Sequence, residues 1–327
     1  MHYDIFNGDA DGICSLVQLR LSNPKNSKLI TGVKRDISLL KKISPVKKDS
    51  VTVLDISMKK NYQEVVDFLE LGVEIFYADH HQSGDLLNHK NFRAHINESS
   101  NICTSLIINK YLSGKYQEWA IVGAYGDGMD KSARIIANKA DLSKDDRAQL
   151  RLLGICINYN SYGENEMDLL YHPSLLYKLL KHNYNPFDFI SNESGVYNKL
   201  LDSYYSDISK AKAISPEIES DNVSIIFLPD ESWSRRVVGV YANLLMQSNK
   251  NRAHALMVIN KDKSYLVGVR APYNNKIGAD LLCSIFGGGG RRGAAGINNL
   301  PKQDKNNFIQ EFKKQFSANK VVSEFRY

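Results

Sequence analysis

The sequence predicts an α/β protein of two domains, the first of which is built on a parallel sheet. Three observations lead to this prediction. The chain has 327 residues, which is longer than a domain with a single hydrophobic core usually is. Its first half alternates short β-rich runs with amphipathic helical stretches, and acid-rich turns follow several of these runs.

The expected strands of the first half are short and apolar, and helical patterns separate them. The strands are expected at residues 3–7, 29–33, 51–56, 73–77 and 93–96. Helices are expected after the first strand and at residues 61–71, 102–112 and 117–124. This alternation predicts a parallel sheet with both faces covered, whose ligands gather at the carboxyl ends of the strands.

A helical, tyrosine-rich stretch separates this half from a second α/β unit. A connector helix is expected at residues 197–213, and Ser215-Pro216 ends it. Strands at 223–228, 255–259 and 265–269, helices at 232–247 and 277–284, and a glycine-rich loop follow. We therefore predict a catalytic domain at residues 1–195, a helical linker at 196–214 and a smaller substrate-binding domain at 215–327.

The composition is that of a globular protein, with 43% hydrophobic and 24% charged residues and a formal net charge of +6. No apolar run approaches the ~18 residues that a membrane helix needs, and the first residues lack a signal-peptide pattern. Four cysteines without CxxC spacing predict reduced thiols rather than disulfides or a zinc site. We expect a cytoplasmic protein that does not associate with membranes. A homodimer is one assembly that the sequence leaves open.

The first acidic motif, Asn7-Gly8-Asp9-Ala10-Asp11-Gly12, follows the first strand directly. Asp9 and Asp11 lie two residues apart in a turn between glycines, so both carboxylates can point at one position. Hard divalent cations prefer such oxygen ligands. Taken alone, the motif could equally be an Asx-rich turn that caps the next helix.

Three further motifs follow in order. Asp55 ends the apolar strand at 51–56, where burial of a carboxylate is costly unless it is paired or metal-bound. Asp79-His80-His81 follows the strand at 73–77, so one imidazole can bind a metal while its neighbour faces a substrate. Asp127 stands between two glycines. Alone, Asp55 could cap a helix, and a histidine pair is more often a surface feature.

Together these motifs place carboxylates and imidazoles at the ends of successive elements. Such a donor set favours one or two Mn²⁺ or Mg²⁺ ions over tetrahedral zinc. Two-metal sites of this kind stabilise the attacking and the leaving oxygen of a phosphoryl group.

A glycine–arginine segment near the C-terminus is a candidate anion site. Its glycines include Gly288, Gly289 and Gly290, and Arg291 and Arg292 follow. Glycines leave backbone N–H groups unshielded, and arginines offer forked donors that suit phosphate. Arg270, after the strand at 265–269, could converge on the same anion. The alternatives are a flexible loop with solvated arginines and a surface position for Arg270.

In this order, the motifs resemble those of the DHH phosphoesterase superfamily, in the subgroup with a DHH-associated C-terminal domain and a GGGH-type loop. The resemblance implies an N-terminal parallel-sheet domain, a smaller C-terminal α/β domain and a cleft between them. It also implies roles for individual residues. The implied Mn²⁺ ligands are Asp9, Asp11, Asp55, His80 and Asp127. Asp79 would orient a neighbour, and His81 would stabilise or protonate the leaving oxygen. Arg270, Gly288, Gly289, Gly290, Arg291 and Arg292 would bind a phosphate.

The chain departs from the superfamily's pattern at three positions. Many members carry a histidine ligand four residues before the first aspartate, where this chain has Ile5. RecJ-like members carry an acid two residues before it, where this chain has Asn7. One metal site is therefore expected to be poorer in ligands. Arg291 replaces the usual histidine of the loop, and we expect this fixed charge to favour a more anionic substrate end.

The resemblance implies a Mn²⁺-dependent hydrolase of short oligonucleotides or small nucleotide phosphates. Activities of this class include those of nanoRNases, phosphatases acting on 3′-phosphoadenosine 5′-phosphate, and RecJ-like exonucleases. The expected partner is a short nucleic acid or nucleotide, because no long basic tract or added domain is present to hold an extended strand. Two alternatives remain: a cyclic-dinucleotide phosphodiesterase, and a nucleotide-binding regulatory protein with a degraded metal site.

Overall fold

A five-stranded parallel sheet forms the centre of the first of two compact units, Met1–Tyr204. The computed structural model describes residues 1–317. The strand order is β2-β1-β3-β4-β5, and every neighbouring pair is parallel. The strands are β1 (His2–Phe6), β2 (Lys28–Ile30), β3 (Ser50–Leu54), β4 (Glu74–Asp79) and β5 (Phe92–Ile96). The predicted parallel-sheet domain is thus confirmed.

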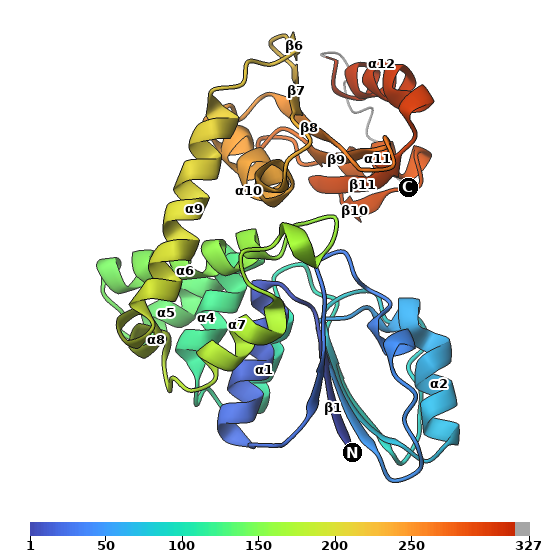
Figure 1. Cartoon of the computed structure of the whole chain (residues 1–327), viewed down its shortest axis with the longest axis vertical. Helices are drawn as coiled ribbons and strands as arrows, with labels where there is room; N and C mark the ends of the chain where they lie inside the picture. Colours follow the sequence, from blue (N-terminus) through green and yellow to red (C-terminus); the bar gives the residue numbers. More distant parts are fainter. Residues whose placement is uncertain (318–327) are drawn as a thin grey trace, which may run out of the picture. The chain divides into compact units, whose positions relative to one another are not determined.

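Helices cover both faces of this sheet, which explains why its central strands are almost entirely buried. On one face, α2 (Tyr62–Glu70) places Val65, Phe68 and Leu69 against the strands. On the other face, α1 (Ala10–Ser22) and α3 (Thr104–Tyr111) lie against the strands, and α4 (Gln117–Gly126) packs on these two helices. Figure 1 labels α1 and α4 on this side of the sheet. The remaining helices of this unit are α5 (Asp130–Lys139), α6 (Lys144–Asn160), α7 (Pro173–Leu180) and α8 (Pro186–Asn192).

The helix α9 (Ser194–Lys212) contains the division between the two units, which falls between Tyr204 and Tyr205. Tyr197, Leu200, Tyr204, Ile208 and Ala211 form its buried stripe. These residues recur at intervals of three and four, which is the helical pattern that predicted a connector here. The predicted linker, residues 196–214, therefore corresponds to a continuous helix over most of its length.

The second unit, Tyr205–Tyr327, contains a six-stranded mixed sheet in the order β10-β11-β9-β8-β7-β6. Among its neighbouring pairs, β7 and β8 are parallel and the others are antiparallel. The strands are β6 (Ile218–Glu219), β7 (Val223–Leu228), β8 (Ala253–Ile259), β9 (Tyr265–Arg270), β10 (Gly289–Arg291) and β11 (Ala294–Leu300). The predicted second α/β unit is thus present.

Helices also cover this second sheet. One face packs against α10 (Ser232–Ser248), where Gly268 allows close approach because a Cβ there would lie 2.6 Å from Val238 Cγ1. The other face packs against α11 (Ala279–Ile285) and α12 (Lys305–Phe316), with Phe308 and Phe312 in the core.

One prediction, for the glycine-rich segment, was wrong. This segment was expected to be a loop, but Gly289–Arg291 and Ala294–Leu300 form an antiparallel hairpin. Gly288 and Gly290 are needed for this close pairing: a Cβ on Gly288 would lie 2.3 Å from the Gly296 carbonyl oxygen, and one on Gly290 would lie 2.5 Å from Ala295 Cα. The strand was missed because a glycine run lacks the side-chain alternation that normally identifies one.

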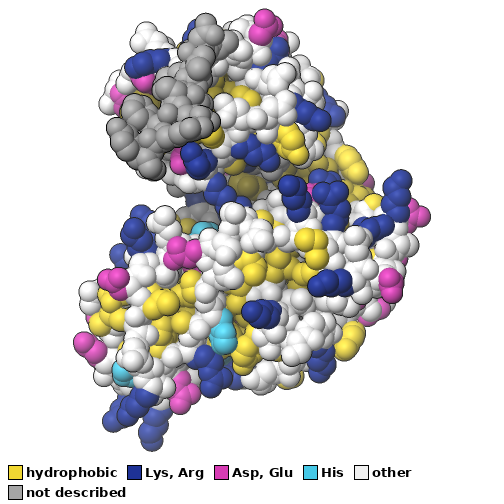
Figure 2. All heavy atoms as spheres, turned by 180° about the vertical axis from the view of Figure 1, so that it is seen from behind, with side chains coloured by type: hydrophobic (Ala, Val, Ile, Leu, Met, Phe, Trp, Pro, Cys, Tyr) yellow, Lys and Arg dark blue, Asp and Glu magenta, His cyan; other side chains and the backbone are white. Residues whose placement is uncertain are grey.

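The basic side chains on the surface are dispersed rather than gathered in one patch. Lys and Arg side chains are spread over both units on the face drawn in Figure 2, as the modest net charge of +6 leads one to expect. Within residues 1–317, none of the helices combines the length and the apolar character that crossing a bilayer requires.

A buried ion pair joins the first strand to the first helix. Arg20 Nε donates to Asp4 Oδ2 at 2.9 Å, and Arg20 Nη2 donates to the other oxygen. Asp4 is fully buried and also accepts from Ser27 Oγ at 2.6 Å. Burial alone would raise the pKa of Asp4, but the hydrogen bonds from Arg20 and His2 outweigh it and lower the pKa to about 2.

This pair predicts an acid-dependent loss of stability. A lowered pKa stabilises the fold above the unfolded value of 3.8, and that contribution is lost as the pH falls towards 2. The expected loss is about 2 kcal/mol of unfolding free energy. Asp4→Asn should destabilise the protein by about 3 kcal/mol at pH 7, because Arg20 remains buried without a counter-charge. Urea unfolding followed by circular dichroism at several pH values measures both effects. Asp145→Asn, an exposed position in α6, is the control, and an unchanged acid dependence in Asp4→Asn would contradict the prediction.

Candidate metal centre

Five aspartates gather at the carboxyl edge of the N-terminal sheet. Asp9 follows β1, Asp55 follows β3, and Asp79 ends β4. Asp11 lies in the first turn of α1, and Asp127 is the C-cap of α4. In the order β2-β1-β3-β4-β5, the chain goes from β1 to a neighbour on one side, β2, and then to a neighbour on the other side, β3. Open α/β sheets form ligand sites at such a change of side.

Close backbone packing explains the glycines of the first motif. A Cβ on Gly8 would lie 1.9 Å from the Gly32 carbonyl oxygen, and one on Gly12 would lie 2.2 Å from the Asn7 carbonyl oxygen. Asp9 is the N-cap of α1, and its Oδ1 accepts from Gly12 N at 3.0 Å. The helix-capping alternative is therefore correct for Asp9, and it coexists with a position inside the acidic cluster.

Asp11 also accepts hydrogen bonds from the N-terminus of a helix. Its Oδ2 accepts from Thr104 N and its Oδ1 from Ser105 N, both at 2.7 Å. These are N–H groups at the start of α3, whose positive dipole end favours a carboxylate. Each carboxylate oxygen has a second lone pair, so Asp11 can still bind a cation.

Asp55 has a strained backbone. Its φ of 60° lies in the left-handed region, which non-glycine residues seldom adopt. The hydrogen bond from Asp55 N to the Ala78 carbonyl oxygen, 3.0 Å long, holds it there. Strain of this kind concentrates at functional sites, where the surrounding structure imposes it.

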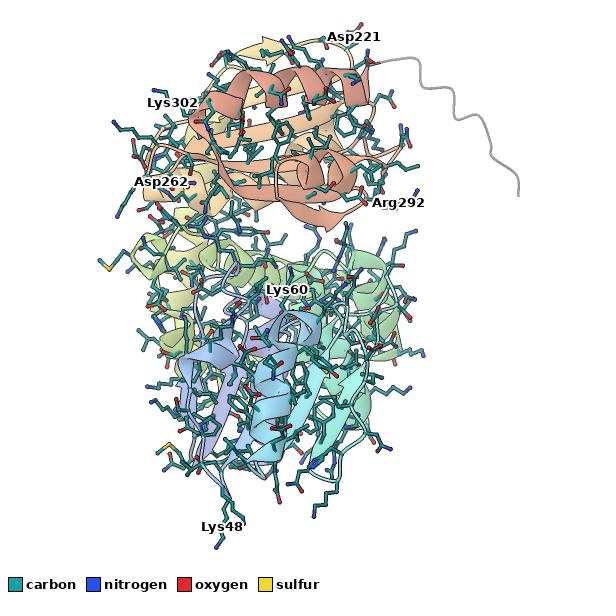
Figure 3. The ribbon with its side chains drawn as sticks, turned by 90° about the vertical axis from the view of Figure 1, so that its right-hand side faces the viewer. Lys48, Lys60, Asp221, Asp262, Arg292 and Lys302 are labelled. Atoms are coloured by element: carbon teal, nitrogen blue, oxygen red, sulfur yellow. The ribbon has the colours of Figure 1, made fainter. Side chains whose placement is uncertain are left out.

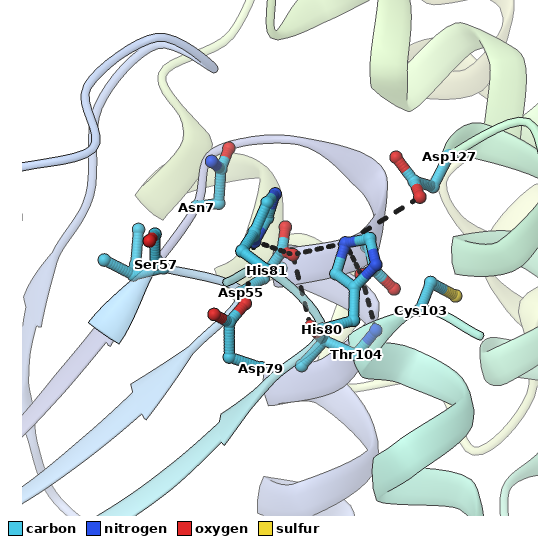
Figure 4. A network of polar contacts seen from close by, with 12 residues as sticks. Asn7, Asp55, Ser57, Asp79, His80, His81, Cys103, Thr104 and Asp127 are labelled. Carbon is cyan, nitrogen blue, oxygen red and sulfur yellow. Dashed lines mark hydrogen bonds and ion pairs between the residues drawn. The ribbon is translucent and has the colours of Figure 1, made fainter. Parts of the chain in front are cut away.

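The two histidines of the third motif have different partners. His81 Nδ1 lies 2.7 Å from Asp79 Oδ1, so Asp79 orients His81. His80 is buried, and its Nε2 lies 3.4 Å from Asp55 Oδ1 and 3.9 Å from both Asp11 Oδ2 and Asp127 Oδ2 (Figure 4). The His81 side chain is 44% exposed, so a substrate can reach it.

These distances define a candidate cation position. One ligand atom each from Asp55, His80 and His81 lie within 4.8 Å of one another. Carboxylate oxygen and imidazole nitrogen suit Mn²⁺, and the oxygen ligands also suit Mg²⁺. Asp79 Oδ2 is buried and forms no hydrogen bond within the described residues, which leaves further negative charge beside the position. The residues present therefore fit a divalent cation.

The electrostatics of the cluster favour positive charge. Burial, followed by the carboxylates of Asp9 and Asp11, raises the pKa of Asp55 well above its usual value. Burial alone would lower the pKa of His81, but the hydrogen bond and charge of Asp79 outweigh it, so the net pKa is raised. Both shifts favour a proton or a cation in this cluster.

Lys34 is the main member of the site that the sequence analysis missed. Its Nζ donates to Asp9 Oδ2, lies 3.1 Å from Asn158 Oδ1 and lies 3.9 Å from Asp127 Oδ1. Burial would raise the pKa of Asp9, but the charge and hydrogen bond of Lys34, together with the other hydrogen bonds that Asp9 forms, outweigh it and lower that pKa to about 2. Lys34 follows β2 at the same sheet edge, and this is the signal that could have identified it.

The predicted phosphate-binding residues lie in the second unit. Arg270 pairs with Ala294, which in turn pairs with Arg291, so these three residues form one cross-strand row on one face. Arg270 is buried, and its guanidinium donates to Asn243 Oδ1 at 2.6 Å and to the Gly239 carbonyl oxygen at 3.1 Å in α10. Arg291 and Arg292 are exposed at the hairpin turn, and Figure 3 labels Arg292 there.

The three predicted glycines of this segment divide into two kinds. A Cβ on Gly289 would meet no atom within 4 Å, whereas Gly288 and Gly290 are required by the hairpin. Of the three, Gly289 alone therefore leaves open space beside its backbone. The phosphate-binding role of these residues stays a prediction.

Comparisons with known proteins agree with this architecture. Residues 221–318 match the family model of the DHHA1 domain. No curated protein matches the sequence. Among solved structures, a DHH-domain protein described as a member of a family of ribosomal proteins superposes with a TM-score of 0.64 at 11% identity, covering 96% of this chain and 85% of that one.

Two further structures share the fold. RecJ from Thermus thermophilus, in complex with Mn²⁺, gives a TM-score of 0.63 at 14% identity and covers 96% of this chain. This chain spans about half of that protein, 51%. The pGpG-specific phosphodiesterase from Vibrio cholerae superposes with a TM-score of 0.55 at 12% identity, and the match covers 96% of this chain and 98% of that one. The chain therefore shares the fold of these structures, and its residues 221–318 match the DHHA1 domain, in agreement with the resemblance that its motifs indicated.

Proposed function

We propose that this protein is a metal-dependent phosphoesterase that hydrolyses phosphate esters of short oligonucleotides or small nucleotides. The observation that carries the proposal is the convergence of Asp55, His80 and His81 within 4.8 Å, surrounded by further carboxylates. The DHHA1 domain and the structural similarity to RecJ and to a pGpG-specific phosphodiesterase support it.

Asp55 and His80 are the residues that would hold a Mn²⁺ or Mg²⁺ ion. Both are buried, and they lie 3.4 Å apart through Asp55 Oδ1 and His80 Nε2. Asp9, Asp11 and Asp127 complete the predicted ligand set around them. A bound divalent cation supplies Lewis-acid polarisation of a phosphoryl oxygen and lowers the pKa of a bound water.

We expect His81 to act as the general acid. In the proposed reaction, water adds to phosphorus and releases a proton to solvent, the P–O bond to the leaving group breaks, and the leaving oxygen takes a proton from His81, which solvent then reprotonates. The hydrogen bond from Asp79 fixes the orientation of the imidazole and favours its protonated form.

The proposed substrate is short and anionic. Arg291 and Arg292 would bind a terminal phosphate through forked N–H donors, and Arg270 would support them from the same cross-strand row. NanoRNase-like, phosphoadenosine-phosphatase-like and RecJ-like exonuclease activities all belong to this proposal. The proposal also includes a cytoplasmic location, which was expected from the sequence.

A second candidate is hydrolysis of cyclic dinucleotides or their linear products. The similarity to the pGpG-specific phosphodiesterase favours it, because that structure covers nearly the same length as this chain. A nucleotide-binding regulatory protein without activity is the remaining alternative. Substrate competition separates the two enzymatic candidates, and absence of turnover identifies the third.

The first test uses purified protein, Mn²⁺ and a panel of substrates. The panel contains 5′-labelled dinucleotides, longer RNA and DNA, 3′-phosphoadenosine 5′-phosphate and cyclic dinucleotides. Wild-type protein should cleave at least one of them in a chelator-sensitive manner. Asp55→Asn and His80→Ala should abolish both cleavage and tight Mn²⁺ binding. His81→Ala should lower kcat about 100-fold and weaken Mn²⁺ binding less than Asp55→Asn or His80→Ala does, because it removes the proton donor and leaves Asp55 and His80 in place.

The control for this experiment is Asp145→Asn, an exposed aspartate of α6. It should retain wild-type rates. Mn²⁺ binding without turnover of any substrate would exclude the proposed substrate class. Absence of both would leave the regulatory alternative.

The second test concerns the arginines of the hairpin. Arg291→Ala should raise KM about tenfold for a 5′-phosphorylated dinucleotide and much less for the same dinucleotide without that phosphate, because a charged hydrogen bond is lost only in the first case. Lys302→Ala removes an exposed cation that projects from another side of the same unit and is the control (Figure 3). Equal rates on both substrates before and after Arg291→Ala would contradict the role of Arg291.

A further inference from the structure

The ammonium group of Lys34 lies inside the acidic cluster rather than at its rim. Its three oxygen neighbours are Asp9 Oδ2, Asn158 Oδ1 at 3.1 Å and Asp127 Oδ1 at 3.9 Å. An ammonium group has three N–H donors; Asp9 Oδ2 and Asn158 Oδ1 lie at hydrogen-bonding distance, and Asp127 Oδ1 lies at ion-pair distance. The side chain is 28% exposed, less than is usual for a surface lysine.

The backbone holds Lys34 in this position from two sides. Lys34 N donates to the Ser161 carbonyl oxygen at 2.9 Å, and the Lys34 carbonyl oxygen accepts from Asn7 Nδ2 at 3.2 Å. Asn7 Oδ1 in turn accepts from Asp9 N at 3.2 Å. One neutral side chain therefore shapes the aspartate turn and fixes the lysine that binds it.

The other half of the cluster has a different kind of partner. In the part of the chain that the structure describes, the ion-pair partners of Asp55 are the imidazoles of His80 and His81, at 3.4 and 3.8 Å. Both imidazoles are potential metal ligands, whereas an ammonium group is not. Asp9 thus pairs with the lysine and Asp55 with the histidines, while Asp127 lies 3.9 Å from both Lys34 Nζ and His80 Nε2.

We infer that Lys34 takes the place of one metal ion, so that the protein binds a single divalent cation at Asp55 and His80. Asp9 and Asp127 would be neutralised by Lys34 instead of by a second ion. A second dication at these two carboxylates would have to displace the ammonium group or be repelled by it. This inference rests on the proposed metal-dependent function and refines the predicted ligand set.

The test is the stoichiometry of Mn²⁺ binding, measured by the electron paramagnetic resonance signal of free Mn²⁺ during titration of the full chain. Wild-type protein should bind one Mn²⁺ per chain. Lys34→Met keeps most of the length of the side chain without its charge and should bind two. Lys34→Arg keeps the charge and should bind one. Lys60→Met, which removes an exposed lysine from the same unit, is the matched control and should bind one.

Each outcome bears on the inference. Binding of two ions by wild-type protein overturns it without any variant being needed. A folded Lys34→Met protein that still binds one ion also overturns it, and Lys34→Gln replaces Lys34→Met if circular dichroism shows that the latter is unfolded. These results leave the proposed function intact. Absence of Mn²⁺ binding by wild-type protein and by every variant contradicts the proposed function itself, and the inference with it.

Discussion

The crowding of aspartates at one edge of the first sheet is the constraint on which the rest of the site depends. Asp9, Asp11, Asp55 and Asp79 are each at most 2% exposed, and Asp127 lies beside them. Carboxylates removed from water are costly unless hydrogen bonds or opposite charges compensate them. The structure supplies that compensation locally, through backbone N–H groups for Asp9 and Asp11, an ammonium group for Asp9 and Asp127, and an imidazole for Asp79. Asp55 accepts from Thr104 Oγ1 at 3.2 Å and lies beside both imidazoles, yet burial and the neighbouring carboxylates raise its pKa.

The architecture explains how one sheet edge can hold so much charge. Parallel strands bring their carboxyl ends to the same edge, and the crossover helices start with their N-termini at that edge. The N-terminus of α1 binds Asp9 and that of α3 binds Asp11, so helix dipoles stabilise two of the carboxylates. Asp55 accepts instead from the side chain of Thr104, has the strained φ of 60° and lies beside both histidines.

The second unit uses its glycines and arginines differently. Close strand pairing, rather than a flexible loop, accounts for Gly288 and Gly290, and the resulting hairpin fixes where Arg291 and Arg292 leave the backbone. Arg270 contributes in another way, because α10 binds its guanidinium. A rigid hairpin loses less conformational entropy when an anion binds than a mobile glycine loop would.

Local pattern alone determined much of this protein. Strand–helix alternation predicted the parallel sheet, and most element boundaries fell within a few residues, because apolar periodicity is a local property. The motifs around Asp9, Asp55 and His80 predicted where the acidic cluster would form. Tertiary structure alone decided which groups bind the carboxylates. Lys34 and Asp9 are 25 residues apart in the sequence, and Thr104 and Asp11 are 93 apart. It also decided that a glycine run becomes a strand, since only the neighbouring strand β11 makes a side chain impossible at Gly288 and Gly290. Such contacts depend on how distant segments pack, and no local pattern of residues carries that information.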